Sequence, residues 1–149
     1  IDAGVLRIES HDIAILGTGS PDESVELATG ARCAAAQNRY WQFHDLVFWN
    51  QGGENRGDHD AAYLAAVANR AGVDRGSWDT CMAGDAVRNS VRADTSKALG
   101  VGINATPTVI LNGSGPVPGL PDAASLIARI QELAVAAGAS GSPASSTTP

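Results

Sequence analysis

The sequence predicts an α/β domain in which one strand is followed by several helices, a β-hairpin and a last helix. Three observations support this prediction. Residues 5–16 contain apolar positions typical of a strand, and residues 58–74 carry apolar side chains at the spacing of one helix face. Residues 112–115 read Asn-Gly-Ser-Gly between two short apolar runs, which is the composition of a hairpin turn.

The net charge, the lengths of the apolar runs and the spacing of the histidines argue against several classes of function. The chain has 149 residues and a net charge of −6, which argues against nucleic acid or an anionic membrane surface as a partner. No run of about 18 apolar residues occurs, so no membrane span is predicted. The histidines at 11, 44 and 59 are scattered and match no metal motif, so we expect surface or hydrogen-bonded histidines, no metal site and no cofactor.

The first half of the chain predicts one strand and then helices. Val5 to Leu16 is interpreted as a strand and its exit, although its alternation is imperfect. Ser20 is then the expected helix cap, with Pro21 in the first turn, and the helix runs to residue 39. The following segment, 40–53, is apolar around most of its circumference, which predicts a buried helix.

The second half predicts further helices around the hairpin. Helices are expected over 58–74, 74–85 and 86–100, a strand over Thr108–Leu111 and an edge strand at 116–118. A last helix begins at Pro121-Asp122, and we predict that it buries the stripe Leu126, Ile127, Ile130, Leu133 and Ala134. Residues 137–149 are rich in Ser, Thr, Pro and Gly, which predicts a flexible tail or linker.

Four blocks of the sequence carry a resemblance to a known family. They are "CAAAQNRYWQFHDLVFWNQ", "GVDRGSWDTCM", "ALGVGINATPTVILNG" and "GLPDAASLIARI", in that order. Together they resemble successive blocks of the DsbA-like thioredoxin-fold thiol–disulfide oxidoreductases, over residues 1–136. The resemblance implies a thioredoxin-like fold with a helical insertion, here spanning about 21–100.

The resemblance also assigns a role to the segment before the hairpin. Thr106-Pro107 matches the cis-proline loop of the family, whose backbone holds the substrate cysteine beside the reactive disulfide. With Ala105, these residues are the substrate-binding residues that the resemblance implies. A loop whose backbone holds the substrate peptide suits this chemistry, because disulfide exchange needs the incoming sulfur held close to the attacked one.

The chain departs from the family at its reactive dithiol. No CxxC occurs, so no catalytic residue is assigned, and the first strand, dithiol and first helix of the fold are expected to be missing. One account is that these residues belong to a longer protein. A second is that another chain, or a swapped copy in a homo-oligomer, supplies the strand. A third is a family member that binds without redox chemistry.

The two cysteines allow two readings. The resemblance favours a structural Cys33–Cys81 disulfide, since some secreted members pair cysteines in these blocks, and such a bond fits an oxidising compartment. Free buried thiols acting as small apolar residues are the alternative. Glu9, His11 and Asp12 lie near the end of the first strand, and we interpret them as solvated loop charges.

The function implied by the resemblance is thiol–disulfide exchange with cysteines of exported proteins or peptides. The resemblance implies a redox partner in the membrane and an extracytoplasmic location: periplasmic, cell-envelope or secreted, with an anchor in a missing N-terminal segment. The 149 residues alone are expected to be inactive. The alternatives are a non-catalytic peptide-binding module and a glutathione-dependent isomerase or transferase of the same fold.

Overall fold

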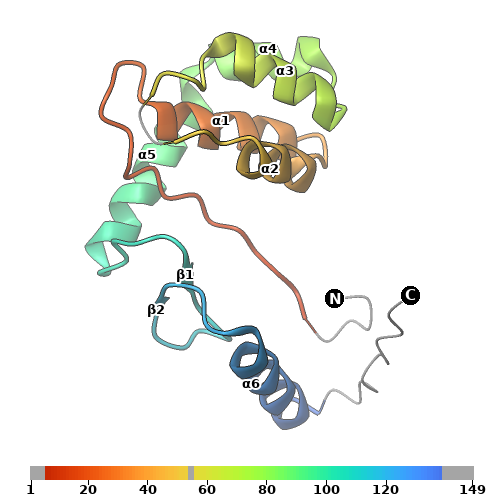
Figure 1. Ribbon diagram of the computed structural model, residues 1–149, viewed down its shortest axis with the longest axis vertical. Coiled ribbons are helices and arrows are strands. Elements are labelled where there is room, and N and C mark those ends of the chain that lie inside the picture. Colours follow the sequence, from red (N-terminus) through yellow and green to blue (C-terminus); the bar gives the residue numbers. More distant parts are fainter. Residues whose placement is uncertain (1–5, 54–55, 139–149) are drawn as a thin grey trace. The chain divides into compact units, whose positions relative to one another are not determined.

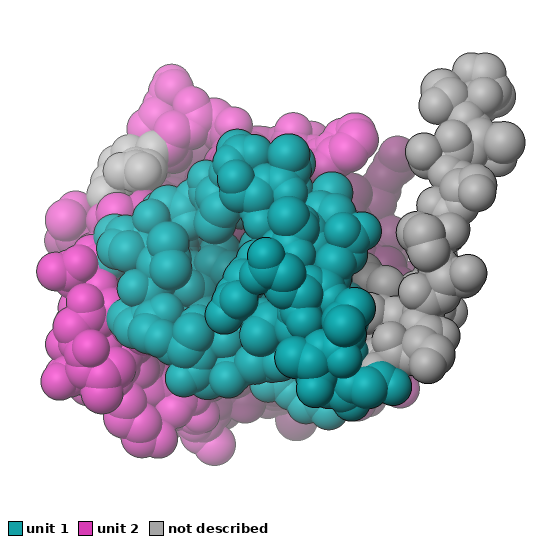
Figure 2. Space-filling model, turned by 90° about the horizontal axis from the view of Figure 1, so that it is seen from below, with its two compact units in different colours: residues 1–11, 105–149 teal, residues 12–104 magenta. Residues whose placement is uncertain are grey.

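The computed structural model describes residues 6–53 and 56–138. These residues form six helices and one two-stranded antiparallel sheet (Figure 1). The chain divides into two compact units, coloured separately in Figure 2. We call residues 12–104 the helical unit, and residues 1–11 with 105–149 the hairpin unit.

The helical unit contains the helices expected between about residues 21 and 100. They are α1 (Glu23–Ala35), α2 (Tyr40–Trp49), α3 (Ala61–Ala71), α4 (Arg75–Ala83) and α5 (Asp85–Gly100). Helix α1 contacts each of the other four, and Figure 1 shows it among them. The core gathers on α1 and on the helix faces turned to it. Its largest fully buried side chains are Phe43, Val91, Thr29 and Cys33.

Helix α1 begins later than the sequence predicts. Its cap is Asp22, whose carboxylate accepts a hydrogen bond from the Val25 backbone N–H at 3.1 Å, so Ser20 is not the cap. The carboxylate caps the helix where the prediction placed the first helical turn. The helix also ends before residue 39, because Asn38 adopts a positive φ of 58° and interrupts the predicted continuous run.

Helix α2 is not buried all round as predicted. Phe43 is its one buried residue, whereas Trp41, Phe48 and Trp49 are exposed. The outer face carries a row of aromatic contacts, including His44 against Phe48 with ring centroids 4.5 Å apart. Helix α2 packs on α1 and α3 with only one side. These neighbours therefore cover only some of its apolar side chains.

The predicted first strand is absent from the described residues 6–16. Val5 lies outside the described residues. Residues 12–16 instead belong to the helical unit, where the Ala14 N–H donates to the Thr95 hydroxyl at 3.0 Å. Ala14 also packs against the cluster of Val25, Ala28 and Val91. The backbone group that we expected in a ladder is therefore bonded to a helix side chain.

Arg32 ties this segment to the helices. Its guanidinium donates to Asp12 at 2.9 Å and to Asp94 at 2.8 Å. The hydrogen bond from Arg32, and then that from Lys97, hold the pKa of the Asp94 carboxyl below its ordinary value of 3.8. The contribution of Asp94 to stability is therefore present above that ordinary value and is lost as pH falls through the lowered pKa.

We expect acid to destabilise the wild type more than an Asp94→Asn variant. The amide cannot be protonated in this range, so the variant lacks the part of the acid sensitivity that Asp94 contributes. Urea unfolding at about pH 7 and about pH 2.5 measures the loss in each protein. Equal losses in the two proteins would show that the Arg32–Asp94 contact does not contribute to the acid sensitivity.

The hairpin unit contains β1 (Thr108–Val109), β2 (Val117–Pro118) and α6 (Ala123–Ala136). The strands are shorter than predicted but pair antiparallel, with Thr108 opposite Pro118 and Val109 opposite Val117. Of the predicted stripe, Leu126, Ile130, Leu133 and Ala134 are half-buried and Ile127 is exposed, so the stripe marks the less exposed face of α6 but is not buried as predicted. Within this unit the described sheet, two residues per strand, is too small to cover a helix face. Of the predicted tail, residues 139–149 lie outside the described residues.

Candidate functional site

The loop at Ala105–Pro107 is formed by hydrogen bonds at its two ends. The Thr108 hydroxyl donates to the Ala105 carbonyl at 2.6 Å, which closes the loop across Thr106 and Pro107. The Pro107 carbonyl accepts from the Gly119 N–H at 2.7 Å, just beyond β2. A proline fits here because it has no N–H to leave unpaired at the mouth of the strand. The Thr106–Pro107 peptide bond is cis.

The turn of the hairpin has the geometry that its sequence favours. The Ser114 N–H donates to the Leu111 carbonyl at 2.9 Å, which closes a four-residue turn. The two central residues, Asn112 and Gly113, have positive φ values of 46° and 72°. Positive φ at both positions is typical of the type I′ turn, whose twist matches that of the flanking strands. The strands pair one residue out of step with this turn: Leu111 faces Ser114 across the turn, whereas Val109 lies opposite Val117, so one extra residue lies between the turn and β2.

Thr106 and Pro107 are exposed, and Ala105 is half-buried. The Thr106 side chain and the ring of Pro107 are therefore accessible at the surface of the hairpin unit. The structure brings these three sequence-predicted residues together in one short loop. An exposed loop that runs into a half-buried strand is an arrangement that can align an extended peptide.

Cys33 and Cys81 form a disulfide, with their Cα atoms 5.8 Å apart. The bond joins α1 to α4 inside the helical unit, and Cys33 is fully buried. Beside it, the Trp78 indole N–H donates to the Gly30 carbonyl at 3.0 Å, so α4 is held to α1 by a second link. Because these are the two cysteines of the sequence, the 149 residues contain no free thiol.

Glu9, His11 and Asp12, which the sequence analysis interprets as solvated loop charges, lie in two different environments. Asp12 is not a solvated charge, because its carboxylate accepts from the Tyr40 hydroxyl at 2.8 Å as well as from Arg32. Glu9 and His11 are exposed, as expected for loop charges, and lie 3.8 Å apart. Asp12 thus has a structural role in the helical unit.

His59 is neither at the surface nor hydrogen-bonded through its ring to a described residue, contrary to the expectation for the histidines. Its side chain is only 6% exposed, and neither ring nitrogen has a hydrogen-bond partner among the described residues. No sequence pattern predicts this burial, since His59 stands in a polar stretch between two aspartates. Its neighbours in the fold come from segments far away in the sequence, such as Glu23.

Within 6–53 and 56–138, no three His, Cys, Asp or Glu side chains form a cluster suited to a metal ion. No helix in the same residues is both long enough and apolar enough to cross a membrane.

Comparison with known proteins identifies one family. A family model described as a DSBA-like thioredoxin domain matches residues 17–131. No curated protein and no solved structure gives a significant match. The matched range includes the disulfide, the loop at Ala105–Pro107 and most of α6.

Proposed function

The chain belongs to the DSBA-like thioredoxin domain family, and from this premise we propose that it is the substrate-binding part of a thiol–disulfide oxidoreductase. The proposed substrates are cysteine-containing proteins or peptides outside the cytoplasm. The observation that carries the proposal is the exposed loop Ala105–Pro107 running directly into β1 within the family match. The Cys33–Cys81 disulfide supports an oxidising compartment, where such bonds persist.

In the proposed reaction, a dithiol of the substrate is oxidised while a CxxC disulfide is reduced. The substrate thiolate attacks one sulfur of that disulfide to form a mixed disulfide, and the second substrate thiol then resolves it. The loop contributes positioning: it holds the substrate backbone so that its sulfur stays in line with the bond under attack. The CxxC is not among these residues, so the full protein or a partner must supply it.

One observation favours a second candidate, a module that binds peptides without redox chemistry. Both cysteines are used in the disulfide that joins α1 to α4, which leaves no sulfur free for exchange. The two candidates differ in what the complete reading frame encodes. A CxxC upstream of Ile1 favours the oxidoreductase, and its absence favours the binding module.

We expect that the 149 residues alone will not oxidise a reduced peptide, whereas the product of the complete reading frame will. In that product, Thr106→Arg is expected to lower kcat/KM for peptide oxidation by about tenfold, the effect of losing one good contact to the substrate. The added side chain would cover the exposed loop and obstruct an extended peptide.

Gln131→Arg on the exposed side of α6 is the matched control, because it adds the same charge away from the loop. Its kcat/KM should equal that of the wild type. Turnover by the 149 residues alone, or equal effects of the two arginines, would contradict the proposed role of the loop.

A further inference from the structure

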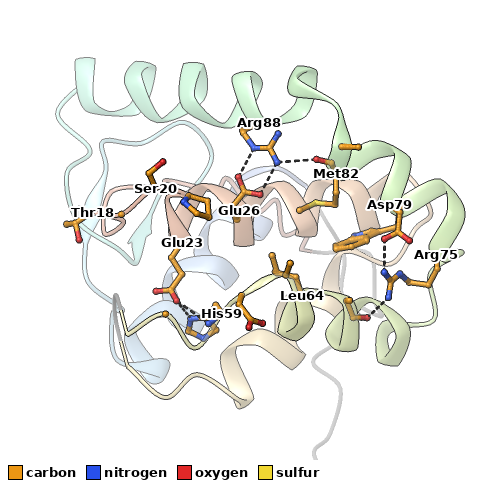
Figure 3. A pocket seen from close by; sticks show the side chains of 18 residues that line it. Thr18, Ser20, Glu23, Glu26, His59, Leu64, Arg75, Asp79, Met82 and Arg88 are labelled. Carbon is orange, nitrogen blue, oxygen red and sulfur yellow. Dashed lines mark hydrogen bonds and ion pairs between the residues drawn. The ribbon is translucent and has the colours of Figure 1, made fainter.

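A cavity of about 740 Å³ lies in the helical unit, apart from the loop at Ala105–Pro107 and from the disulfide. Its walls come from the segment before α1, from α1 itself, from α3 and α4, and from the start of α5 (Figure 3). Small-molecule sites in proteins are concave, about 300–1,000 Å³ in volume, and mostly apolar with a few polar groups. This cavity falls within that range, and the expected exchange chemistry does not use it.

The apolar part of the wall is provided by Leu64, Trp78 and Met82. Leu64 and Trp78 are buried and belong to the main core cluster, and Met82 packs against it. Leu64 and Trp78 are 4% and 3% exposed and form the closed base of the cavity, whereas Met82 is half-buried and exposes more of its surface. A ligand that covers them gains the free energy of removing apolar area from water.

Both arginines of the wall are paired with carboxylates. Figure 3 shows Arg88 of α5 reaching Glu26 of α1, and Arg75 beside Asp79 on α4. Arg88 donates to both oxygens of Glu26, Arg75 donates to Asp79, and His59 Nδ1 lies 3.2 Å from Glu23 Oε1. Asp60 also lines the cavity, but its carboxylate accepts the Tyr63 N–H as the cap of α3. An anion would therefore enter without a free cationic side chain to meet it, at a cost in desolvation. The lining therefore disfavours an anionic ligand.

His59 presents an unused hydrogen-bonding atom in this wall. Its Nε2 is buried and has no partner among the described residues. Nδ1 lies 3.2 Å from the Glu23 carboxylate without the alignment of a hydrogen bond, and a carboxylate oxygen at that position favours the neutral tautomer with the proton on Nδ1. The ring is further held edge-to-face against Tyr63, with centroids 4.8 Å apart. In its neutral form, Nε2 is then an acceptor that lacks a donor.

Arg75 provides a second unused atom of opposite character. Its two terminal nitrogens donate to the Ala65 carbonyl and to Asp79, but its buried Nε–H has no partner among the described residues. Buried polar atoms of this kind are uncommon and costly to leave unpaired. Two residues that line the cavity thus each hold one unpaired buried atom, an acceptor in His59 and a donor in Arg75.

We propose that this cavity binds a neutral small molecule with an apolar body and an amide or hydroxyl group, which donates to His59 Nε2. Groups of this kind both donate and accept, so they also suit Arg75 Nε–H. The apolar body lies on Leu64, Trp78 and Met82. This site is independent of the proposed disulfide exchange, because it lies wholly in the helical unit and contains no cysteine.

The test is an NMR titration of the 149-residue chain with three probes that share one apolar body. The probes are 4-tert-butylbenzamide, 4-tert-butylbenzoate and 4-tert-butylbenzylamine, which are neutral, anionic and cationic. We expect saturable shifts of the Trp78 indole N–H and the His59 ring with the benzamide, and binding at least about tenfold weaker with the charged probes. Absence of saturable shifts, or tighter binding of a charged probe, would overturn the proposal.

Two alanines of α3 give a matched pair of variants. Ala61 is exposed and lines the cavity, whereas the adjacent Ala62 is exposed and does not. Ala61→Phe should fill the cavity and abolish benzamide binding, and Ala62→Phe should leave it unchanged. Equal effects of the two would place the probe elsewhere.

His59→Phe keeps the ring but removes Nε2, and should weaken benzamide binding about tenfold. It should leave unchanged the binding of tert-butylbenzene, which has no polar group. Unchanged benzamide affinity in this variant would exclude the assigned hydrogen bond.

Discussion

Replacing both Cys33 and Cys81 by alanine is expected to lower the free energy of unfolding by about 4 kcal/mol. The bond links positions 48 apart in the sequence, and without it the unfolded chain regains the freedom of that loop. The loss adds to the removal of a fully buried sulfur from the interface of α1 with α4. Urea unfolding followed by far-UV circular dichroism measures the difference between variant and wild type.

Reduction of the wild type provides the control for this prediction. A strong reductant should shift the unfolding midpoint of the wild type toward that of the double-alanine variant and should not shift the midpoint of the variant itself. Coincident midpoints of the oxidised wild type and the variant would show that the bond does not stabilise the helical unit.

Phe43→Ala is expected to lower the free energy of unfolding by about 3–5 kcal/mol, because it opens a cavity at the centre of the helical unit. Phe43 is 0% exposed, and its ring centroid lies 6.2 Å from that of Trp78. The ring also lies against Gly30, where an added Cβ would come within 2.7 Å of the Phe43 Cζ atom. The neighbours are thus fixed on several sides and cannot collapse into the space.

Phe48→Ala is the matched control on the same helix. Phe48 is 56% exposed and contacts His44 on the outer face of α2, so its removal should cost less than about 1 kcal/mol. Thermal and urea unfolding of both variants would give the comparison. A similar loss for the two would mean that α2 is buried on both faces, as its composition suggested.

Local chemistry made parts of the fold predictable from the sequence. The apolar spacing over 58–74 predicts a stripe at Tyr63, Leu64, Val67, Ala68 and Ala71. All of these except the half-buried Tyr63 are buried on α3, and Gly72 ends the helix in the left-handed conformation. The Asn112-Gly113 pair gave the hairpin turn, because few other residues adopt positive φ at two consecutive positions. In these elements the conformation depends on neighbours in the sequence.

Predictions that depended on distant neighbours were less successful. The aromatic residues of α2 were expected to be buried, but burial depends on which faces α1 and α3 cover. The first segment was expected to be a strand, yet its N–H at Ala14 is bonded to Thr95 on α5. A strand requires a partner strand, and the residues themselves do not record whether one lies beside them.

The residues of the candidate sites also differ in whether the sequence or the tertiary structure identified them. The sequence by itself determined the family, through ordered blocks of residues, and the resemblance to that family pointed to the loop at Ala105–Pro107 and to the Cys33–Cys81 bond, which the structure contains. Only the tertiary structure decided that Ala14 meets Thr95 and that His59 faces Glu23. These contacts join residues far apart in the sequence, and they depend on how the helices pack around α1. Sequence spacing specifies local turns and helix faces, whereas packing alone determines which distant side chains meet.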